Sequence, residues 1–161
     1  MPYSALRRGR WSSPGQIYLI SATAHRRRRL FADYQRACVV AREIARMAKT
    51  GSWEPIAWVI MPDHVHLLVR LCDTPLPEAM RLFKGRTGRA VGVIGDVGGP
   101  VWQHAYHDHA VRRDEDLLSI ARYVCANPVR AGLVRSVRDY PFWDACWLAR
   151  SKQWERSPDV P

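Results

Sequence analysis

Two hydrophobic patterns alternate along this chain. Stretches rich in β-branched and aromatic residues are typical of strands, and they occur at 16–24, 53–60, 64–70 and, less regularly, 101–112. Stretches in which apolar residues recur every three or four positions predict amphipathic helices, and they occur at 34–49, 76–91 and 117–126. The aromatic segment 140–148 is expected to pack onto the folded domain.

The order of these elements predicts a ferredoxin-like α+β fold. Strand, helix, strand, strand, helix, strand is the split βαβ arrangement, in which an antiparallel sheet carries helices on one face. The additional C-terminal helix is then expected to cross the opposite face. A chain of 161 residues suits one domain, and the expected divisions are an N-terminal arm at 1–15, a single catalytic domain at 16–148 and a C-terminal tail at 149–161. The glycine-rich segment 92–100 is expected to be a flexible loop.

The strand at 64–70 carries the first candidate chemistry. Because side chains alternate along a strand, His64 and His66 share one face, while Val65 and Leu67 face the other side. Two such imidazoles start about 7 Å apart at the backbone, which lets both reach one divalent ion. The simpler alternative is a solvated histidine pair on an exposed sheet face, so the case for a metal depends on groups elsewhere.

The C-terminal helix offers a second pair of polar groups. Tyr123 and Asn127 are four residues apart and therefore share one helix face. If that face meets the two histidines, a phenol and an amide oxygen join two imidazoles. Taken alone, Tyr123 is better explained as a half-buried packing residue, and Asn127 is well explained as a helix cap before Pro128.

A strong positive charge points to a polyanionic partner. Lys and Arg number 25 against 15 Asp and Glu, a formal net charge of +10, and arginine suits phosphate through its bidentate fork. The alternatives are a merely basic protein, a solvated charge run, and cations that stabilise a helix C-terminus. The candidate nucleic-acid contacts are Arg26, Arg27, Arg28, Arg29, Arg86, Arg89 and Arg112.

The rest of the composition argues against other classes. The four cysteines are far apart and form no Cys-x-x-Cys pair, so neither a zinc ribbon nor a disulfide framework is expected. No apolar run reaches the roughly 18 residues of a membrane helix, and no signal-peptide core follows the basic N-terminus. A cytoplasmic protein is therefore expected.

Three motifs, in this order, resemble those of one family. They are Met-Pro-Asp-His-Val-His at 61–66, Trp-Gln-His-Ala-Tyr-His-Asp-His-Ala-Val-Arg-Arg-Asp-Glu-Asp at 102–116, and Arg-Tyr-Val-Cys-Ala-Asn-Pro-Val-Arg-Ala-Gly-Leu-Val at 122–134. Together they resemble the REP-associated tyrosine transposases, single-tyrosine enzymes with a His-hydrophobic-His motif that are related to insertion-sequence transposases. The resemblance spans about residues 15–148.

The resemblance implies specific roles for four residues. His64 and His66 match the metal-binding histidines, Asn127 matches the third metal ligand, and Tyr123 matches the nucleophile. It further implies Mg²⁺ or Mn²⁺ as cofactor and single-stranded DNA near a hairpin, typically a REP element, as substrate. Cleavage would pass through a 5′-phosphotyrosine. A monomer or homodimer associated with the nucleoid is expected.

Two other functions remain open at this stage. The first is a domesticated protein that binds hairpin DNA or RNA without cutting it. The second is a metal hydrolase of small phosphoesters that uses His64 and His66 with water. The strongly basic chain argues against a small substrate, and the presence of all four candidate residues favours the cleaving enzyme.

Overall fold

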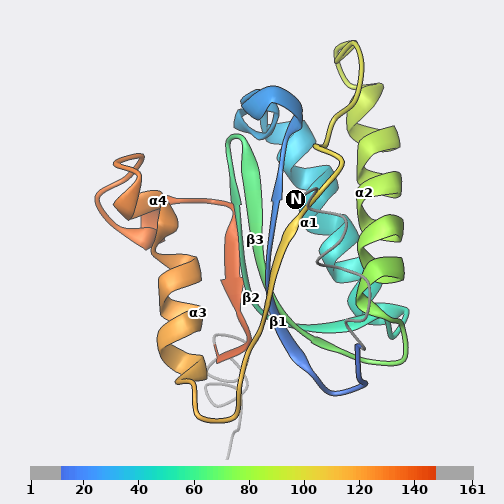
Figure 1. Ribbon diagram of the computed structural model, residues 1–161. Coiled ribbons are helices and arrows are strands. Elements are labelled where there is room, and N and C mark those ends of the chain that lie inside the picture. Colours follow the sequence, from blue (N-terminus) through green and yellow to red (C-terminus); the bar gives the residue numbers. More distant parts are fainter. Residues whose placement is uncertain (1–11, 148–161) are drawn as a thin grey trace, which may run out of the picture.

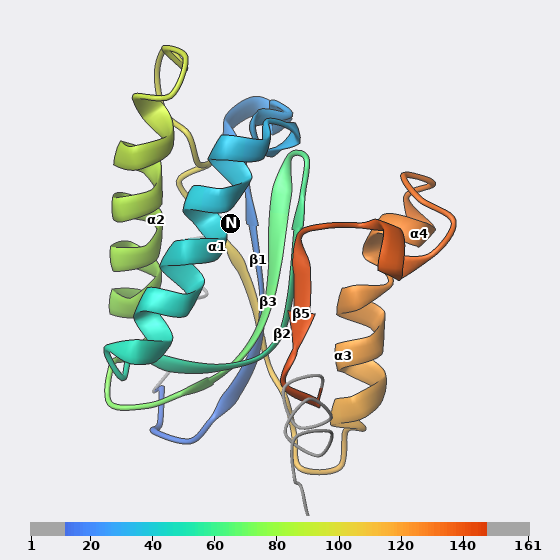
Figure 2. The same ribbon diagram turned by 180° about the vertical axis from the view of Figure 1, so that it is seen from behind.

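The computed structural model describes residues 12–147 as a sheet between two layers of helices (Figures 1 and 2). Its five strands lie in the order β4-β1-β3-β2-β5, and neighbouring strands are antiparallel. The strands are β1 (Ile17–Thr23), β2 (Trp53–Met61), β3 (His64–Leu71), β4 (His107–Ala110) and β5 (Trp143–Ala145). The helices are α1 (Tyr34–Lys49), α2 (Leu76–Gly92), α3 (Leu117–Cys125) and α4 (Asn127–Arg130), with short 3₁₀ turns η2 (His25–Arg27), η3 (Leu30–Ala32) and η4 (Val137–Asp139).

The predicted α+β architecture is confirmed. Helices α1 and α2 cover one face of the sheet, and α3 and α4 lie on the other (Figure 2). Most of the predicted arm at 1–15 and the whole tail at 149–161 lie outside the described residues. No helix within residues 12–147 is long and apolar enough to cross a membrane.

Strand β3 separates two hydrophobic cores because its side chains alternate. Val65 and Leu67 are fully buried in the core shared with α1 and α2. Leu68 points to the other face, where it packs with Ala121 and Val124 of α3. The face that carries His64 and His66 is thus the face that α3 covers, as the sequence predicts.

Local sequence signals set the helix ends. The side chain of Asp33 accepts a hydrogen bond from the backbone N–H of Arg36 at 2.9 Å, which caps α1. Gly51, with φ of +72°, takes the chain out of α1 in a conformation that a β-carbon would disfavour. Asp116 caps α3 through the N–H groups of Leu118 and Ser119.

The last predicted strand is shorter than expected. Strand β4 covers four residues, and the preceding stretch makes only an isolated bridge between Ala24 and Trp102. The carbonyls of Gln103 and His104 instead accept hydrogen bonds from the Lys84 ammonium, at 2.6 and 2.8 Å. Carbonyls that accept from a lysine are less available for hydrogen bonds to a neighbouring strand. A composition rich in β-forming residues does not reveal such a contact.

Two further details differ from the sequence interpretation. Helix α3 ends at Cys125, next to Asn127 and Pro128 as predicted, but a second short helix, α4, follows at once, with Pro128 in its first turn, where a missing N–H is tolerated. The aromatic segment also contributes β5, which pairs with β2 from Ala57 to Val59. Three residues are too few to show a strand period.

The glycine-rich loop is anchored rather than loose. The Arg36 guanidinium donates to the carbonyl of Ile94 at 2.7 Å. The Arg28 guanidinium donates to the carbonyl of Val97 at 2.7 Å and also to that of Pro100. The loop between α2 and β4 is therefore held by α1 and by the segment between β1 and α1, a contact over about 60 to 70 residues of sequence.

Candidate functional site

The two histidines converge at the start of β3, directly after the turn from β2. Their Nε2 atoms lie 3.1 Å apart, and their rings meet edge to face with centroids 4.7 Å apart. Two nitrogens at this separation suit a shared ion, since metal–imidazole bonds of about 2.1 Å would then subtend an angle near 90°. The two backbones are farther apart than the two Nε2 atoms, because the side chains lean toward each other.

The other nitrogen of each ring has its own partner. His64 Nδ1 lies 2.6 Å from a carboxylate oxygen of Asp63, and because a carboxylate only accepts, this hydrogen bond leaves the Nε2 lone pair available. His66 Nδ1 lies 2.6 Å from the hydroxyl of Ser21 on β1. A hydroxyl can donate or accept, so Ser21 suits either tautomer of His66. Such outer partners orient metal-binding histidines.

Burial, with help from nearby charges, keeps His66 neutral. Burial is the main cause that lowers the pKa of His66 to about 4, followed by the nearby charges of His64 and Arg130. Burial alone would raise the pKa of Asp63, but the hydrogen bond and charge of His64, together with Arg27, hold it below its usual value. At neutral pH, Asp63 is therefore ionised and His66 can act as a ligand.

The tyrosine helix lies over this face of the sheet. Helix α3 packs on β2 and β3, and the side chain of Tyr123 is 51% exposed. The Nδ2 group of Asn127 donates to the carbonyls of Tyr123 and Val124, at 3.1 and 3.0 Å, and Oδ1 remains as an acceptor. The Arg130 guanidinium lies 4.0 Å from the centre of the Tyr123 ring.

The donor set fits a divalent ion that takes nitrogen and oxygen ligands. Within residues 12–147, no three His, Cys, Asp or Glu side chains are placed to share a metal. The pair His64 and His66 would therefore need an amide oxygen or water to complete a set of ligands. Mixed imidazole and oxygen ligands leave open which divalent ion is preferred.

The candidate arginines divide into bound and exposed groups. Arg27 pairs with Asp63 at 3.3 Å, Arg28 holds the glycine-rich loop, and Arg86 pairs with the buried Glu43 of α1 at 3.1 Å. A phosphate would have to compete with these interactions. The candidate arginines that are exposed and make no side-chain hydrogen bond or ion pair within residues 12–147 are Arg26, Arg29, Arg89 and Arg112.

Three members of the site were missed by sequence reasoning. Asp63 precedes His64 directly, so an acid beside the histidine motif was a usable signal. Arg130 follows Tyr123 by seven residues, about two helical turns, and its position could also have been anticipated. Ser21 gave no signal, because only the pairing register of β1 and β3 brings it opposite His66.

Comparisons with known proteins identify a family that matches the part of the chain carrying these candidate residues. The family described as "Transposase IS200 like" matches residues 15–127, a segment that includes all four candidate residues. The chain belongs to this family of DNA nicking and joining enzymes.

Within the family, the chain is similar to two REP-associated tyrosine transposases. The chain is similar to the REP-associated tyrosine transposase of Escherichia coli (strain K12), with 27% identity over 128 residues that cover 78% of this chain and 73% of the relative. It also shares its fold with a solved REP-associated tyrosine transposase bound to a REP hairpin, at a TM-score of 0.72 and 24% identity, covering 92% of this chain and 86% of that one. The resemblance predicted from the three motifs is confirmed.

Proposed function

We propose that this protein cuts and rejoins single-stranded DNA beside a hairpin of the REP type, with Tyr123 as the nucleophile. The observation that carries the proposal is the convergence of two imidazole Nε2 atoms at 3.1 Å on the sheet face over which the helix of an exposed tyrosine lies. A solved fold relative is bound to a REP hairpin, which supports the choice of substrate. A DNA substrate also implies action at the nucleoid in the cytoplasm.

The proposed reaction exchanges one phosphodiester for another. The Tyr123 oxygen forms a bond to the scissile phosphorus, and the bond from phosphorus to the 3′-oxygen breaks. The phenol proton is released and the departing 3′-oxygen takes up a proton, leaving a 5′-phosphotyrosine and a free 3′-hydroxyl. Because the covalent link conserves the phosphodiester, a 3′-hydroxyl can attack it to reseal the strand.

We further propose that His64, His66 and Oδ1 of Asn127 hold Mg²⁺ or Mn²⁺. When bound, such an ion supplies Lewis-acid stabilisation of the negative charge on the phosphate oxygens. Asp63 and Ser21 orient the two rings, and Arg130, at 4.0 Å from the Tyr123 ring, positions that ring. Arg130 also adds positive charge near His66.

A nicking assay tests the proposed function. Labelled oligonucleotides that carry a REP-type hairpin with single-stranded flanks are incubated with protein and Mg²⁺ or Mn²⁺, then separated on a denaturing gel. We expect a shortened strand and a slower protein–DNA band. Hairpin binding without either product would instead identify a non-cleaving binding protein, and hydrolysis of p-nitrophenyl phosphate without nicking would identify a small-phosphoester hydrolase.

The orienting role of Ser21 leads to a prediction on metal affinity. Ser21→Ala removes the partner of His66 Nδ1, so Mn²⁺ should bind about 10-fold more weakly, in the range typical of such outer contacts. Calorimetric titration of Mn²⁺ measures the change, and thermal melting checks the fold. Thr23→Val, which removes a hydroxyl from the same strand opposite His64, should bind Mn²⁺ as the unaltered protein does. Equal affinity in Ser21→Ala would contradict the orienting role.

The net charge leads to a prediction on DNA binding. Affinity for hairpin DNA should fall at least about 10-fold between 50 and 200 mM salt, because arginine–phosphate contacts release counterions. Arg29→Gln should reduce the slope of log affinity against log salt by about 0.7–0.9, the loss of one contact. Arg42→Gln, on the exposed side of α1, is the matched control and should keep the slope. Binding that is independent of salt would refute the phosphate contacts.

A further inference from the structure

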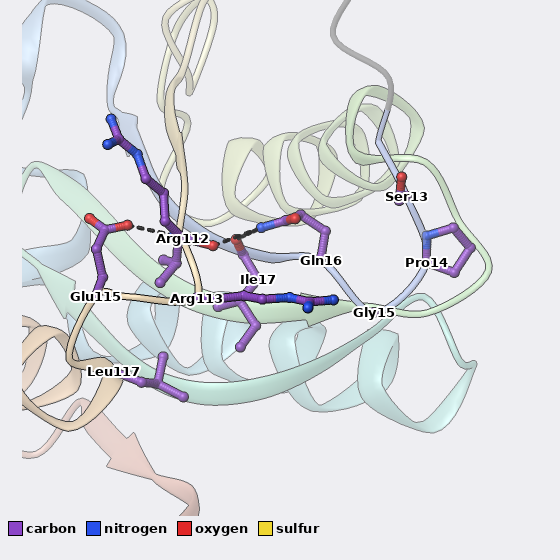
Figure 3. A pocket seen from close by; sticks show the side chains of 10 residues that line it. Ser13, Pro14, Gly15, Gln16, Ile17, Arg112, Arg113, Glu115 and Leu117 are labelled. Carbon is purple, nitrogen blue, oxygen red and sulfur yellow. Dashed lines mark hydrogen bonds between the residues drawn. The ribbon is translucent and has the colours of Figure 1, made fainter.

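A pocket with a mixed polar and apolar lining lies at the far end of the face that carries the histidine pair. It has a volume of about 490 Å³ and forms between residues 13–17, which lead into β1, and residues 111–117, which join β4 to α3 (Figure 3). Ligand pockets typically measure about 300–1,000 Å³. The metal-binding groups proposed above do not line it, so the proposed cleavage chemistry leaves it unused.

The register of the sheet connects this pocket to the histidine pair. Ser21 lies opposite both His66 and His107, and Leu19 lies opposite both Leu68 and His109, so these residues share one face. Val111 continues the series, since its N–H donates to the carbonyl of Ile17. His107, which is level with His66 across the sheet, and Val111 are four residues apart along the edge strand, a distance of about 14 Å.

The β4 edge of the strip between the two places is open to solvent. Helix α3 packs on β2, β3 and β5, which lie toward the other side of the sheet. The side chains of His107 and His109 on the edge strand β4 are exposed. A chain of phosphates could therefore run along β4 from the histidine pair to the pocket without displacing a helix.

The groups in the pocket match a nucleotide. The Nε2 group of Gln16 donates to the carbonyls of Ile17 and Val111, at 3.0 and 2.9 Å, so its Oε1 remains as an acceptor. The Arg113 side chain extends toward Gly15 below Gln16 (Figure 3), and among residues 12–147 it has no hydrogen bond or ion pair. A planar guanidinium can stack on a base or bind a phosphate.

A carboxylate at the pocket rim adds a second acceptor. Glu115 accepts hydrogen bonds from the backbone N–H of Arg112 at 2.6 Å and from His109 at 2.8 Å, and these contacts fix its position. The hydrogen bond from Arg112, followed by that from His109, lowers the pKa of Glu115, so the group is ionised at neutral pH. Carboxylates accept from the exocyclic amino groups of bases.

We propose that this pocket binds one unstacked base of the DNA strand that is cut, within about four nucleotides of the scissile phosphate. The limit of four follows from the 14 Å path and the 3.4 Å spacing of stacked nucleotides. Arg113 contacts the base face or its phosphate, and Gln16 and Glu115 accept from an exocyclic amine. Adenine, cytosine and guanine each carry such an amine and thymine does not, so the pocket disfavours thymine. The inference rests on the proposed single-stranded DNA substrate.

The test is a scan of the single-stranded flank in binding assays. Abasic sites, placed one at a time within six nucleotides of the nicked bond, should weaken binding about 10-fold at one position and little elsewhere. Thymine at that position should act like the abasic site. Arg113→Gln should bind the intact oligonucleotide more weakly. In this variant, the abasic site at the sensitive position should cause no further loss of affinity, because the side chain and the base contribute to the same interaction.

Matched controls separate this inference from the proposed function. Arg42→Gln, which removes the same charge on the opposite layer, should keep the position-dependent loss. If the oligonucleotide is nicked but abasic sites weaken binding equally at every position, the base pocket is overturned and the proposed function stands. Tight binding of free dAMP or dGMP, with no position-dependent loss in the oligonucleotide, would likewise overturn it and mark the pocket as a small-molecule site.

Discussion

Tyr123→Phe is expected to bind hairpin DNA as the unaltered protein does and to form no covalent adduct, a loss of at least about a thousandfold. Phenylalanine keeps the ring against Arg130 and removes only the attacking oxygen. No hydrogen bond among residues 12–147 uses that phenol oxygen, so the fold should not change. The measurement is a denaturing gel of a labelled oligonucleotide, with binding followed separately by mobility shift.

The other tyrosines supply controls for this prediction. Tyr106, which lies among three histidines in the sequence, is only 8% exposed and packs in the core with α1 and α2. Tyr140 donates its hydroxyl to the carbonyl of Ile60 at 2.7 Å. Tyr34 is 68% exposed, so Tyr34→Phe is the matched control and should form the adduct normally. An adduct in Tyr123→Phe, or one mapped to another tyrosine, would show that the nucleophile was wrongly assigned.

His64→Ala and His66→Ala are each expected to abolish nicking while hairpin affinity stays within about twofold. Either change removes one of two nitrogens that lie 3.1 Å apart, and a single imidazole binds a divalent ion weakly. Phosphate contacts by arginine dominate the affinity for DNA, so binding should persist. Nicking is measured at saturating protein, and Mn²⁺ affinity is measured by calorimetry.

The controls for the histidine variants address folding and metal dependence. His104→Ala changes an exposed histidine outside the pair and should nick normally. Thermal melting checks whether His66→Ala, which removes a half-buried ring, still folds. Asn127→Ala should be milder, because water can replace one amide oxygen. Full nicking by either histidine variant, or unchanged nicking in excess chelator, would rule out the metal site.

Local rules determined much of this fold from the sequence alone. The twofold period of β3 placed His64 and His66 opposite Val65 and Leu67, and burial on both faces of the sheet enforces that alternation. The caps at Asp33 and Asp116 are local features of this kind, because each acts on backbone groups two or three residues away. The element order and the three motifs likewise identified the fold and the family.

Contacts between distant segments decided the rest. Ser21 reaches His66 only through the β1–β3 register, and Arg28 reaches the loop carbonyls across about 70 residues. Lys84 shortens β4 by binding the carbonyls of Gln103 and His104. Likewise, the pocket at Gln16 exists because β1 and β4 are neighbours in the sheet. A sequence pattern reports the preferences of adjacent residues, whereas these contacts depend on how whole elements pack, so only the tertiary structure could place them.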